Sequence, residues 1–533
     1  MLEARPAPTA LAFNGMVATP HPLATGAGLA ALRDGGSAAD AVVAANAVLT
    51  VLYPDQTAIG GDVFLLYHDA AESPAGKLHA LNGSGRAPTA ASRAALRAAG
   101  HAAMPARGIH AVTVPGTVDA WDAALTRFGR LGLERCLQPA IALARDGFPV
   151  SAALAARLDR AAPVLDAFPD LRTLFAPEGH ASRTGDRLRL PALAATLEHI
   201  AHDGRDAFYA GPIAAAIIAA SDRLDGAFTL ADLADHHAEW VEPLFIDYRG
   251  VGVAGFPPNS QGLTALLALN LVEVSTPAAW GTPDHLHPLI EAKKLAFAVR
   301  DRLVADPAFA PFDAAKVVGK PFAADLWRAY DHDRAAPGTP DGAGDTVYLC
   351  AVDRNGNAAS LIQSLYMSFG SGVVAGDTGV VLHNRGAAFS LDDDHPNRLD
   401  GGKRPRHTLM PSMLYRDGAL LGPLGTQGGD AQAQVTLQLI TGLVDHHLEP
   451  QAAVDAPRWV AGGTAADPST LVSFEARFPN AAMAGLAARG HVVRRVGAWD
   501  TGFGHAQMIL RDPDTGLLRG AADPRADGLA LGY

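Results

Sequence analysis

The sequence contains little cysteine and little charge, and each scarcity excludes a class of protein. Its 533 residues include only two cysteines, Cys136 and Cys350, so a disulfide scaffold is excluded and no zinc-ligand spacing is present. Charged residues make up 18% of the chain against 49% hydrophobic residues, which excludes a disordered polymer. The net charge of −12 argues against a nucleic-acid partner.

Long apolar runs are also missing. The most apolar stretch, residues 41–53, is too short to span a membrane and contains Asn46. Residues 1–19 lack a charged segment followed by an apolar one, so no signal peptide is expected. The sequence therefore predicts a soluble, cytoplasmic protein with no membrane partner.

Glycine and proline are abundant instead, with 55 and 37 residues. No G-X-Y period accompanies them, which excludes collagen, and the chain is too apolar to be a flexible linker. A chain of this length can bury a large core. These features predict a compact protein of helices and strands with many tight turns.

Hydrophobic spacing predicts mostly helices in the first half of the chain. Ser37 can cap a helix over residues 38–52, which Pro54 ends, and residues 63–67 are typical of a buried strand. Apolar residues at helical spacing predict further helices within 116–148, 151–220 and 282–302.

The composition changes abruptly at residues 335–345. This run is rich in proline, glycine and aspartate, has no apolar residue larger than alanine, and predicts an exposed, mobile loop. Residues 346–352 are then typical of a strand, 353–357 of a hairpin turn and 358–365 of the returning strand. Short strands and glycine-rich turns follow, so the C-terminal third is expected to be richer in β-structure.

A threonine that starts a strand behind such a loop has a particular chemical use. If the Asp345–Thr346 bond is cut, Thr346 carries both a hydroxyl and a free α-amine, whose pKa of about 8 suits it to take the hydroxyl's proton. Nucleophile and base then belong to one residue. Because threonine also favours strands for structural reasons, this pattern alone leaves the catalytic role open.

An ordered series of motifs runs through nearly the whole chain. It consists of GGSAADAVVAANAVLTVLYPDQTAIGGDVFLL at 35–66, VPGTVDAW at 114–121, QPAIALARDGFPV at 138–150, GDTVYLCAVDRNGNAASLIQSLYMSFGSG at 344–372, GKRPRHTLMP at 402–411, GTQGGD at 425–430, APRW at 456–459 and ADPRADGLALGY at 522–533. The series resembles the γ-glutamyltranspeptidase family of N-terminal-nucleophile hydrolases. Each piece is short, and their shared order makes the resemblance specific.

The resemblance implies an α+β fold, a four-layer αββα sandwich, made as one inactive precursor. Self-cleavage would give a helix-rich large subunit, residues 1–345, and a β-richer small subunit, residues 346–533. The two products would stay together as a heterodimer that forms one intertwined catalytic domain. The sequence leaves open whether this heterodimer pairs further.

The resemblance also implies catalytic roles. Thr346 would attack the Asp345 carbonyl and later the amide of a small-molecule substrate, and water or an amine acceptor would release the acyl group. Gly428 and Gly429 match the glycine pair whose N–H groups form the oxyanion hole, although a glycine pair is also common in turns. Ser364 matches a second hydroxyl that bonds the nucleophile.

Two further matches concern polar residues outside this group. Asn357 matches a polar residue near the nucleophile, although it and Ser364 could instead satisfy local backbone groups. Arg86 matches the arginine that pairs with the substrate's α-carboxylate, a role suited to a planar guanidinium.

The substrate pocket departs from the pattern of the glutathione-cleaving members, which have N-x-Q-M-D-D-F after the nucleophile strand where this chain has HNRGAAFS at 383–390. Loss of an acid that binds an ammonium, with gain of an arginine, predicts an acyl group that carries a carboxylate but no amine. The pattern resembles the branch of glutathione hydrolase-like, cephalosporin acylase-like and oxamate amidohydrolase proenzymes. The departures are Ala388 for the acid, Arg385 for the glutamine, Tyr366 for an asparagine, His407 and Thr408 for a serine pair, and Val347 for a threonine.

Three features resemble metal or acid–base sites, and a simpler interpretation is favoured for each. His285 and His287 are two residues apart and share no helix face, so they are interpreted as surface or core residues. Residues 392–394, three aspartates, are interpreted as an exposed turn. His505 is expected to be structural or pocket-lining, because the α-amine makes a separate base unnecessary. No metal and no cofactor are predicted.

The sequence thus predicts a self-processing amidohydrolase or acyltransferase of the γ-glutamyltransferase family, acting through Thr346 on a carboxylate-bearing amide. One alternative is a true glutathione hydrolase or transpeptidase of glutathione metabolism. Another is an oxamate amidohydrolase or a glutaryl (cephalosporin) acylase. A third is an unprocessed, non-catalytic binding protein, for which Val347 and Tyr366 leave room.

Overall fold

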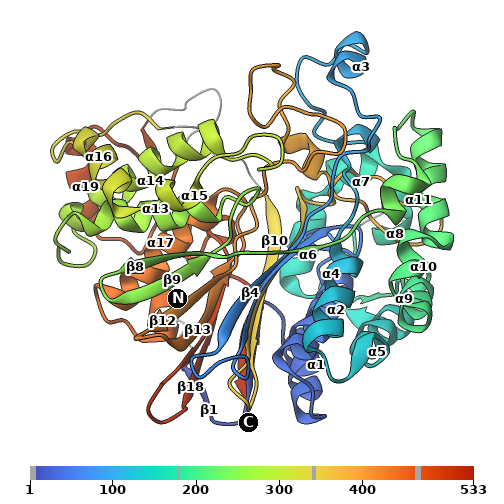
Figure 1. Cartoon of the computed structure of the whole chain (residues 1–533), viewed down its shortest axis with the longest axis horizontal. Helices are drawn as coiled ribbons and strands as arrows, with labels where there is room; N and C mark the ends of the chain where they lie inside the picture. The colour runs from blue at the N-terminus through green and yellow to red at the C-terminus, as the bar shows by residue number, and fades with distance from the viewer. Residues whose placement is uncertain (1–7, 177–180, 339–343, 463–469) are drawn as a thin grey trace.

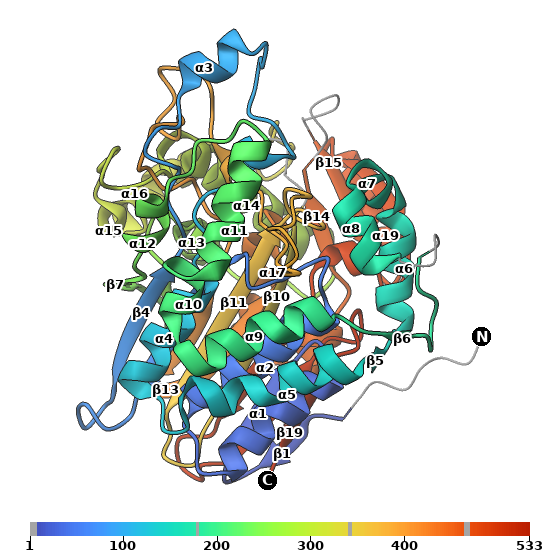
Figure 2. The same ribbon diagram turned by 90° about the vertical axis from the view of Figure 1, so that its right-hand side faces the viewer.

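The computed structural model describes residues 8–176, 181–338, 344–462 and 470–533. Two seven-stranded antiparallel sheets face each other at its centre (Figures 1 and 2). Sheet A has the order β1 (Ala10–Ala12), β18 (Leu518–Ala522), β17 (Ala506–Arg511), β13 (Ala419–Thr426), β12 (Ser412–Arg416), β9 (Val251–Gly255) and β8 (Leu244–Tyr248). Sheet B has the order β19 (Leu529–Gly532), β2 (Met16–Thr19), β10 (Asp345–Val352), β11 (Ala358–Tyr366), β3 (Asp62–Asp69), β4 (Lys77–Gly83) and β7 (Glu239–Val241).

Helices cover the outer face of each sheet, so the expected α+β sandwich is confirmed (Figure 1). On sheet B lie α1 (Pro22–Arg33), α2 (Ala38–Leu52) and α4 (Thr117–Phe128). The helix α5 (Gly132–Asp146) packs on α2 and α4, and α9 (Pro191–Asp203) packs on α5. On sheet A lie α13 (Gly262–Glu273) and α17 (Ala431–Val444), and α14 (Pro283–Leu303) packs on both of these helices.

The helix α2 shows why the sequence builds this layer. Every one of its residues is buried, because apolar side chains surround it and both of its sides face other elements. Its start is fixed by a capping box in which the Ser37 side chain accepts from the N–H of Asp40 and the Asp40 carboxylate accepts from the N–H of Ser37.

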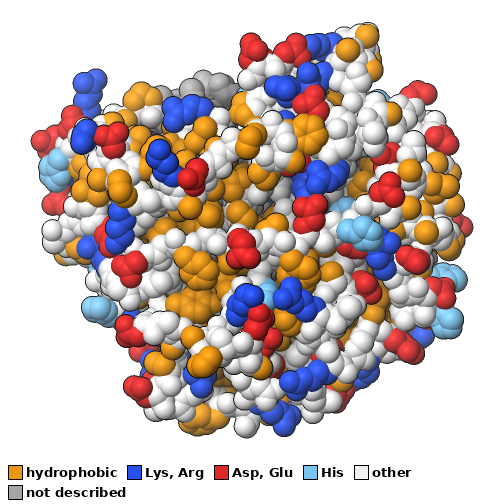
Figure 3. All heavy atoms as spheres, viewed as in Figure 1, with side chains coloured by type: hydrophobic (Ala, Val, Ile, Leu, Met, Phe, Trp, Pro, Cys, Tyr) orange, Lys and Arg blue, Asp and Glu red, His pale blue; other side chains and the backbone are white. Residues whose placement is uncertain are grey.

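Apolar side chains from both sheets fill the space between them. Phe64, Tyr348 and Ile362 of sheet B pack with Met413 and Ile509 of sheet A. Basic and acidic side chains are interspersed on the face shown in Figure 3. Within the described ranges, every helix is too short or too polar to cross a membrane.

The remaining elements are short. The helices are α3 (Arg93–Ala98), α6 (Ala152–Arg160), α7 (Ala162–Ala167), α8 (Pro169–Phe175), α10 (Arg205–Tyr209), α11 (Pro212–Arg223), α12 (Leu230–Ala234), α15 (Ala314–Val317), α16 (Lys320–Leu326), α18 (Pro450–Asp455) and α19 (Asn480–Ala488). The strands are β5 (Phe148–Pro149), β6 (Arg187–Leu188), β14 (Trp459–Ala461), β15 (Leu471–Glu475) and β16 (Val492–Val496). Single 3-10 turns lie at Ile109–Ala111, Trp327–Ala329, Arg385–Ala388 and Thr501–Phe503.

Candidate active site

Thr346 lies in the middle of sheet B, on the strand β10 that pairs with β2 and β11. Its side chain is buried and lies on the same side of the strand as Tyr348 and Cys350, which pack between the two sheets. The register of β10 and β11 shifts between Asp345 and Val347, so a β-bulge lies beside Thr346. Bulges of this kind re-aim side chains and are frequent next to active sites.

A chain of hydrogen bonds joins Thr346 to the carbonyl group that precedes it. Thr346 Oγ1 donates to Ser364 Oγ over 3.1 Å, and Ser364 Oγ donates to the Asp345 carbonyl oxygen over 2.5 Å. The N–H of Tyr366 also donates to Ser364 Oγ, over 2.7 Å. Ser364 therefore uses its one donor and both acceptor positions, and it bridges the hydroxyl of Thr346 and the neighbouring carbonyl.

The two glycines of the loop after β13 lie against the same segment. Gly428 and Gly429 have φ values of +135° and +56°, in the region that favours glycine. A Cβ atom on Gly344, two residues before Thr346, would lie 3.0 Å from the Cα of Gly429 and 3.2 Å from the Tyr366 carbonyl oxygen. Among the described residues, no acceptor takes the N–H of Gly428 or Gly429, so both donors can serve a bound oxyanion.

Behind this loop, a buried glutamine fixes its backbone. Gln261 Nε2 donates to the carbonyl oxygen of Gly429 over 3.1 Å and to that of Thr408 over 3.0 Å. Arg300 Nη1 donates to Gln261 Oε1 over 3.0 Å, so the amide is held in one orientation. The loop is therefore supported from its rear side, which keeps the two N–H groups in place.

Arg385 is a buried cation near this group. Its guanidinium carbon lies 3.8 Å from the centre of the Tyr366 ring, and its Nη2 donates to Thr408 Oγ1 over 3.0 Å. Its Nε and Nη1 have no partner among the described residues. Burial lowers the pKa of Arg385 to about 10, which leaves it protonated at neutral pH. A buried cation with two free donors is suited to a carboxylate.

His407 is fully enclosed beside Arg385. Its Nε2 lies 3.1 Å from Asp62 Oδ2, and its Nδ1 accepts from the N–H of Leu409 over 3.2 Å. Burial, followed by the charge of Arg385, lowers the pKa of His407 to about 3, so the ring is neutral. Both ring nitrogens are occupied, and His407 therefore supports the wall of the site rather than contacting a substrate.

Sequence reasoning missed Asp62 and His383, which form this wall with His407. His383 Nδ1 lies 3.5 Å from Asp62 Oδ2, and Asp62 pairs with Ser364 in the register of β3 and β11. Burial would raise the pKa of Asp62, but His383, His407 and Arg385 together hold it below its usual value. The sequence does contain one signal for Asp62, which is a polar residue directly before the apolar run of a buried strand.

Within the described ranges, Arg86 forms no side-chain hydrogen bond or ion pair with this group. Its side chain is 36% exposed, and its guanidinium donates to Glu239 Oε1 over 3.0 Å, to Asp306 Oδ2 over 3.3 Å and to the Gly402 carbonyl oxygen over 3.1 Å. With Glu239 it lines a cavity of about 700 Å³. The partners of the Arg86 guanidinium in the structure are thus two carboxylates and one backbone carbonyl of the protein itself.

Asn357 is not near the nucleophile, contrary to the sequence prediction. It precedes β11 at the turn of the β10–β11 hairpin, whereas Thr346 lies at the open end. Six residues of strand separate the two ends, about 20 Å at 3.3 Å per residue. Its Nδ2 donates to Asp353 Oδ2 over 2.8 Å and its Oδ1 accepts from the N–H of Ala70 over 3.0 Å, so it stabilises the turn.

The three features that resembled metal or acid–base sites have other surroundings. His285 and His287 are both buried on α14. The acidic turn is exposed, and its Asp393 pairs with Arg93 and Arg97. His505 is buried just beyond Gly504, which packs on Gly428, and burial lowers the pKa of His505 to about 4.

The chain is similar to known proteins over nearly its whole length. The family model described as gamma-glutamyltranspeptidase matches residues 24–533. The glutathione hydrolase-like YwrD proenzyme of Bacillus subtilis is 41% identical over 97% of this chain and 98% of its own length. The oxamate amidohydrolase proenzyme of Klebsiella pneumoniae is 38% identical over 98% of both chains. The crystal structure of cephalosporin acylase from Bacillus halodurans superposes with a TM-score of 0.94 at 39% identity, covering 100% of this chain and 98% of that one.

Proposed function

This chain belongs to the gamma-glutamyltranspeptidase family and is an autoprocessed amidohydrolase, and we propose that Thr346 is the nucleophile for both reactions. One observation carries the proposal. The Ser364 hydroxyl accepts a hydrogen bond from Thr346 Oγ1 and donates one to the Asp345 carbonyl oxygen. A nucleophile and the carbonyl of its own peptide bond are thus held by one side chain.

In self-cleavage, Thr346 Oγ1 attacks the carbonyl carbon of Asp345. Ser364 donates to the carbonyl oxygen as negative charge develops there and accepts the hydrogen bond of the attacking hydroxyl. The C–N bond breaks, the nitrogen takes up a proton, and an ester links Asp345 to Thr346. Water opens that ester, which leaves a carboxylate on Asp345 and a free α-amine on Thr346. The products are residues 1–345 and 346–533, and they remain together in one four-layer N-terminal-nucleophile sandwich.

In substrate turnover, the α-amine of Thr346 takes the proton of its own hydroxyl as Oγ1 attacks the substrate amide. The N–H groups of Gly428 and Gly429 stabilise the oxyanion, because they are fixed donors that need not reorganise. The amine leaves with a proton, and water or another amine then removes the acyl group from Thr346. This cycle needs no group beyond the chain and its substrates.

The substrate that this site favours carries a carboxylate and lacks an α-amine. Arg385 offers Nε and Nη1 to a carboxylate, and Tyr366 and Thr408 hold its guanidinium from two sides. Ala388 contributes no charge that could bind an ammonium group. The relative named as an oxamate amidohydrolase supports the same substrate class, because oxamate carries a carboxylate and no α-amine.

A comparison of two chromogenic amides tests the substrate class. Glutaryl-p-nitroanilide and γ-glutamyl-p-nitroanilide differ only by the α-amine, and we expect kcat/KM to be at least about tenfold higher for the glutaryl compound. Release of ammonia from oxamate is measured in parallel. A clear preference for the γ-glutamyl compound would show that the site does bind an ammonium and that this assignment of Arg385 and Ala388 is wrong.

A further inference from the structure

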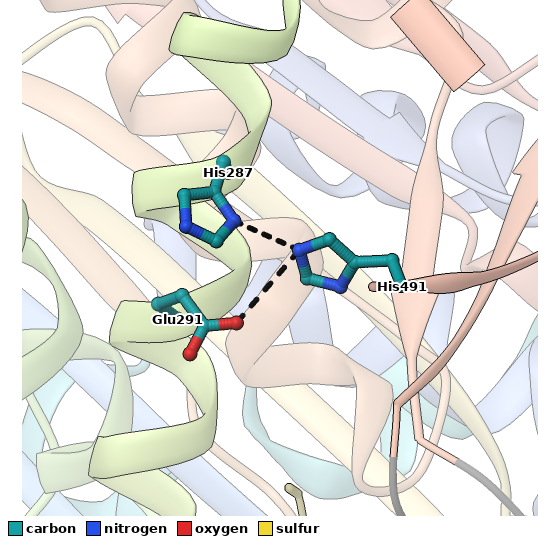
Figure 4. Close-up of side chains that lie close together, drawn as sticks. All are labelled: His287, Glu291 and His491. Carbon is teal, nitrogen blue, oxygen red and sulfur yellow. Dashed lines mark hydrogen bonds and ion pairs between the residues drawn. The ribbon is translucent and has the colours of Figure 1, made fainter. Parts of the chain in front are cut away.

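The helix α14 carries buried ionisable side chains at two places, and the proposed mechanism uses neither group. In the first half of the helix, His287 and Glu291 meet His491, which follows α19 (Figure 4). Near the end of the helix lies Arg300, whose side chain is only 1% exposed. The two groups differ in what they contact.

The charges of the first group argue against a metal ion. Its two imidazoles and one carboxylate have ligand atoms within 4.8 Å of one another, which is a possible ligand set. Lys294 Nζ donates to Glu291 Oε1 over 2.7 Å and already balances that carboxylate, so a divalent ion would leave two uncompensated positive charges in a buried place. Lys294 Nζ also donates to the Ala336 carbonyl oxygen over 2.6 Å. This group therefore holds main chain and is interpreted as structural.

Arg300, in contrast, contacts residues that border the proposed active site. Its Nη1 donates to Gln261 Oε1 over 3.0 Å and lies 2.9 Å from Asp430 Oδ1. Gln261 is the N-cap residue of α13, and Asp430 directly follows Gly429. Because the amide oxygen of Gln261 accepts from a cation, the NH₂ group of the same amide is turned away from Arg300.

The two protons of Gln261 Nε2 bind two separate parts of the site. One goes to the carbonyl oxygen of Gly429 over 3.1 Å, and the other goes to that of Thr408 over 3.0 Å. Thr408 Oγ1 in turn accepts from Arg385 Nη2 over 3.0 Å. One buried amide thus connects the glycine loop (Gly428 and Gly429) with the residue that holds the proposed carboxylate-binding arginine.

These two parts lie at the open end of the β12–β13 hairpin. The pair nearest to that end is Ser412 with Leu424, and Thr408 precedes the first strand whereas Gly429 follows the second. Strand pairing spaces the two arms of the hairpin only as far as this pair. Beyond it, the side chain of Gln261 bridges the two arms.

Other hydrogen bonds attach each arm to its own helix. The N–H of Gln261, at the start of α13, donates to the carbonyl oxygen of His407 over 2.8 Å. The N–H of Gln432, in the first turn of α17, donates to the carbonyl oxygen of Gly429 over 3.3 Å. Loss of the Gln261 side chain would therefore leave both arms in place and remove the bridge between them. The expected consequence is a small change in their spacing, not unfolding.

We propose that Gln261 is a positioning residue that determines which acyl length the site accepts, because it fixes the spacing between the glycine loop and Arg385. This inference rests on the proposed function, in which the glycine loop binds the substrate's carbonyl oxygen and Arg385 binds its carboxylate. An acyl chain held at both ends must match the distance between them. Sites of this kind need their groups within about 0.5 Å of the productive geometry.

A series of p-nitroanilides, running from oxalyl through malonyl, succinyl and glutaryl to adipoyl, measures this spacing. Wild-type protein should prefer one length, with kcat/KM at least about tenfold lower for the neighbouring lengths, since one methylene group allows discrimination of that size. Gln261→Met keeps a side chain of similar size, removes both donors and leaves Arg300 its contact with Asp430. We expect it to reduce the ratio between the best and the neighbouring lengths at least about threefold, per cut molecule.

A matched glutamine separates spacing from stability. Gln438 is also buried, and its Nε2 donates to two carbonyl oxygens, those of Gln434 over 3.1 Å and Trp459 over 2.9 Å. Gln438→Met removes the same number of bonds between α17 and β14 and should leave the length profile unchanged.

A second variant breaks the connection at its other end. Thr408→Val deletes the hydroxyl that accepts from Arg385 without touching the glycine loop, and it should broaden the length profile in the same direction. Thr408→Ser keeps a hydroxyl and should restore the preference. Self-cleavage should proceed in all these variants, because Thr346 and Ser364 bond to none of the altered side chains within the described chain.

Each outcome decides between the possibilities. A wild type without a preferred length, a Gln261→Met protein with the wild-type profile or without self-cleavage, or an equal broadening in Gln438→Met would overturn the positioning role. A wild type that cleaves pentanoyl-p-nitroanilide, which lacks the carboxylate, as well as its best carboxylate-bearing amide would instead overturn the proposed substrate class.

Discussion

Arg385 is the residue on which the substrate assignment depends. Its guanidinium is buried against Tyr366 and keeps Nε and Nη1 free of partners within the described chain. Replacing it by methionine removes the charge and keeps most of the volume, and we expect kcat/KM for a glutaryl amide to fall by about 10- to 100-fold, the usual loss for a charge-assisted pair.

The measurement is a Michaelis curve for each variant, with self-cleavage as the internal control. Arg385→Lys restores the charge but not the planar fork, so it should recover only part of the loss. The cut fraction should be equal in all three proteins, because Arg385 has no role in the first reaction. A methionine variant with unchanged kcat/KM would remove Arg385 from the substrate site.

Ser364 links the two reacting groups and can be tested separately. Ser364→Ala removes the donor to the Asp345 carbonyl oxygen, and self-cleavage should slow by at least about tenfold, since a fixed donor to a developing oxyanion has effects of that order or larger. Ser364→Thr keeps the hydroxyl and should cleave at nearly the wild-type rate. Time courses on denaturing gels measure both, and equal rates in the alanine and threonine variants would contradict the bridging role.

Asp345 predicts a pH dependence in the uncut chain. Burial, and then the nearby charge of Asp55, raises the pKa of Asp345 from 3.8 to about 6. Between these two values the folded chain holds a proton that the unfolded chain has lost, so stability falls as pH rises through this window and stays lower above it.

The test uses the Thr346→Ala background, which stays uncut. Adding Asp345→Asn should raise the free energy of unfolding by about 1 kcal/mol at neutral pH, a figure reduced for the partial exposure of the side chain. Below about pH 4 the two proteins should be equally stable, since Asp345 is then neutral in both states. Denaturant unfolding curves at the two pH values measure the difference in the free energy of unfolding between the two proteins. A difference that grows on acidification would contradict the prediction.

The position of a single residue could be predicted where the local sequence determines which residues lie next to it in space. Thr346 and Ser364 face each other because a hairpin of predictable register joins them. The same hairpin explains why the prediction for Asn357 was wrong. Asn357 is a turn residue, and the turn lies at the end of the hairpin opposite the nucleophile. Asp62 and His383 could not be paired from sequence, because more than 300 residues separate them and a loop contact, the N–H of His383 on the Gly60 carbonyl oxygen, brings them together.

Among the elements, the loop after β13 is the one whose shape the chemistry requires. Gly428 has a φ of +135°, a value that alanine adopts only with strain, while its Cβ would meet nothing closer than 3.5 Å. Gly428→Ala should therefore lower kcat by at least about tenfold with little change in KM, because displaced N–H groups act mainly on the transition state.

A matched glycine separates this effect from general destabilisation. Gly418 has a φ of +81° in the turn between β12 and β13, and its Cβ position has no atom within 4 Å. Gly418→Ala thus carries similar backbone strain away from Thr346 and should keep full kcat. If both alanine variants lose activity together with melting temperature, the loop has no special catalytic role.

The element predictions succeeded where local rules dominate. The predicted helix over 38–52 is α2, whose cap and Pro54 are visible in the sequence, and the predicted hairpin is β10 and β11, although β10 already begins at Asp345. The helical stretch predicted over 151–220 is interrupted in the structure at β6 and between several short helices. Apolar periodicity does not mark the loops between helices, so these breaks could not be predicted. Within the predicted loop, residues 339–343 lie outside the described chain, as do residues 1–7 of the N-terminal prediction.

At the scale of the whole molecule, the site forms because two sheets face each other. Sheet B supplies Thr346 and Ser364, and the glycine loop comes from β13 of sheet A. An α+β fold could be predicted from the motif series, but the order of strands in each sheet could not, since those pairings join residues hundreds of positions apart. The substrate pocket also depends on contacts between residues far apart in the sequence. Which of Arg86 and Arg385 has donors free for a substrate carboxylate could be decided only from the partners of each in the structure.

The intact mass of freshly purified protein, followed by N-terminal sequencing of its chains, tests the central claim that Thr346 cuts the chain and becomes its own base. Wild-type protein should give two chains of about 36 and 19 kDa, by scaling mass with length, and the smaller should begin with Thr-Val-Tyr-Leu-Cys. Thr346→Ala should give one full-length chain without amidase activity. A single uncut wild-type chain that hydrolyses its amide at the full rate, or a new N-terminus at any other residue, would contradict the account.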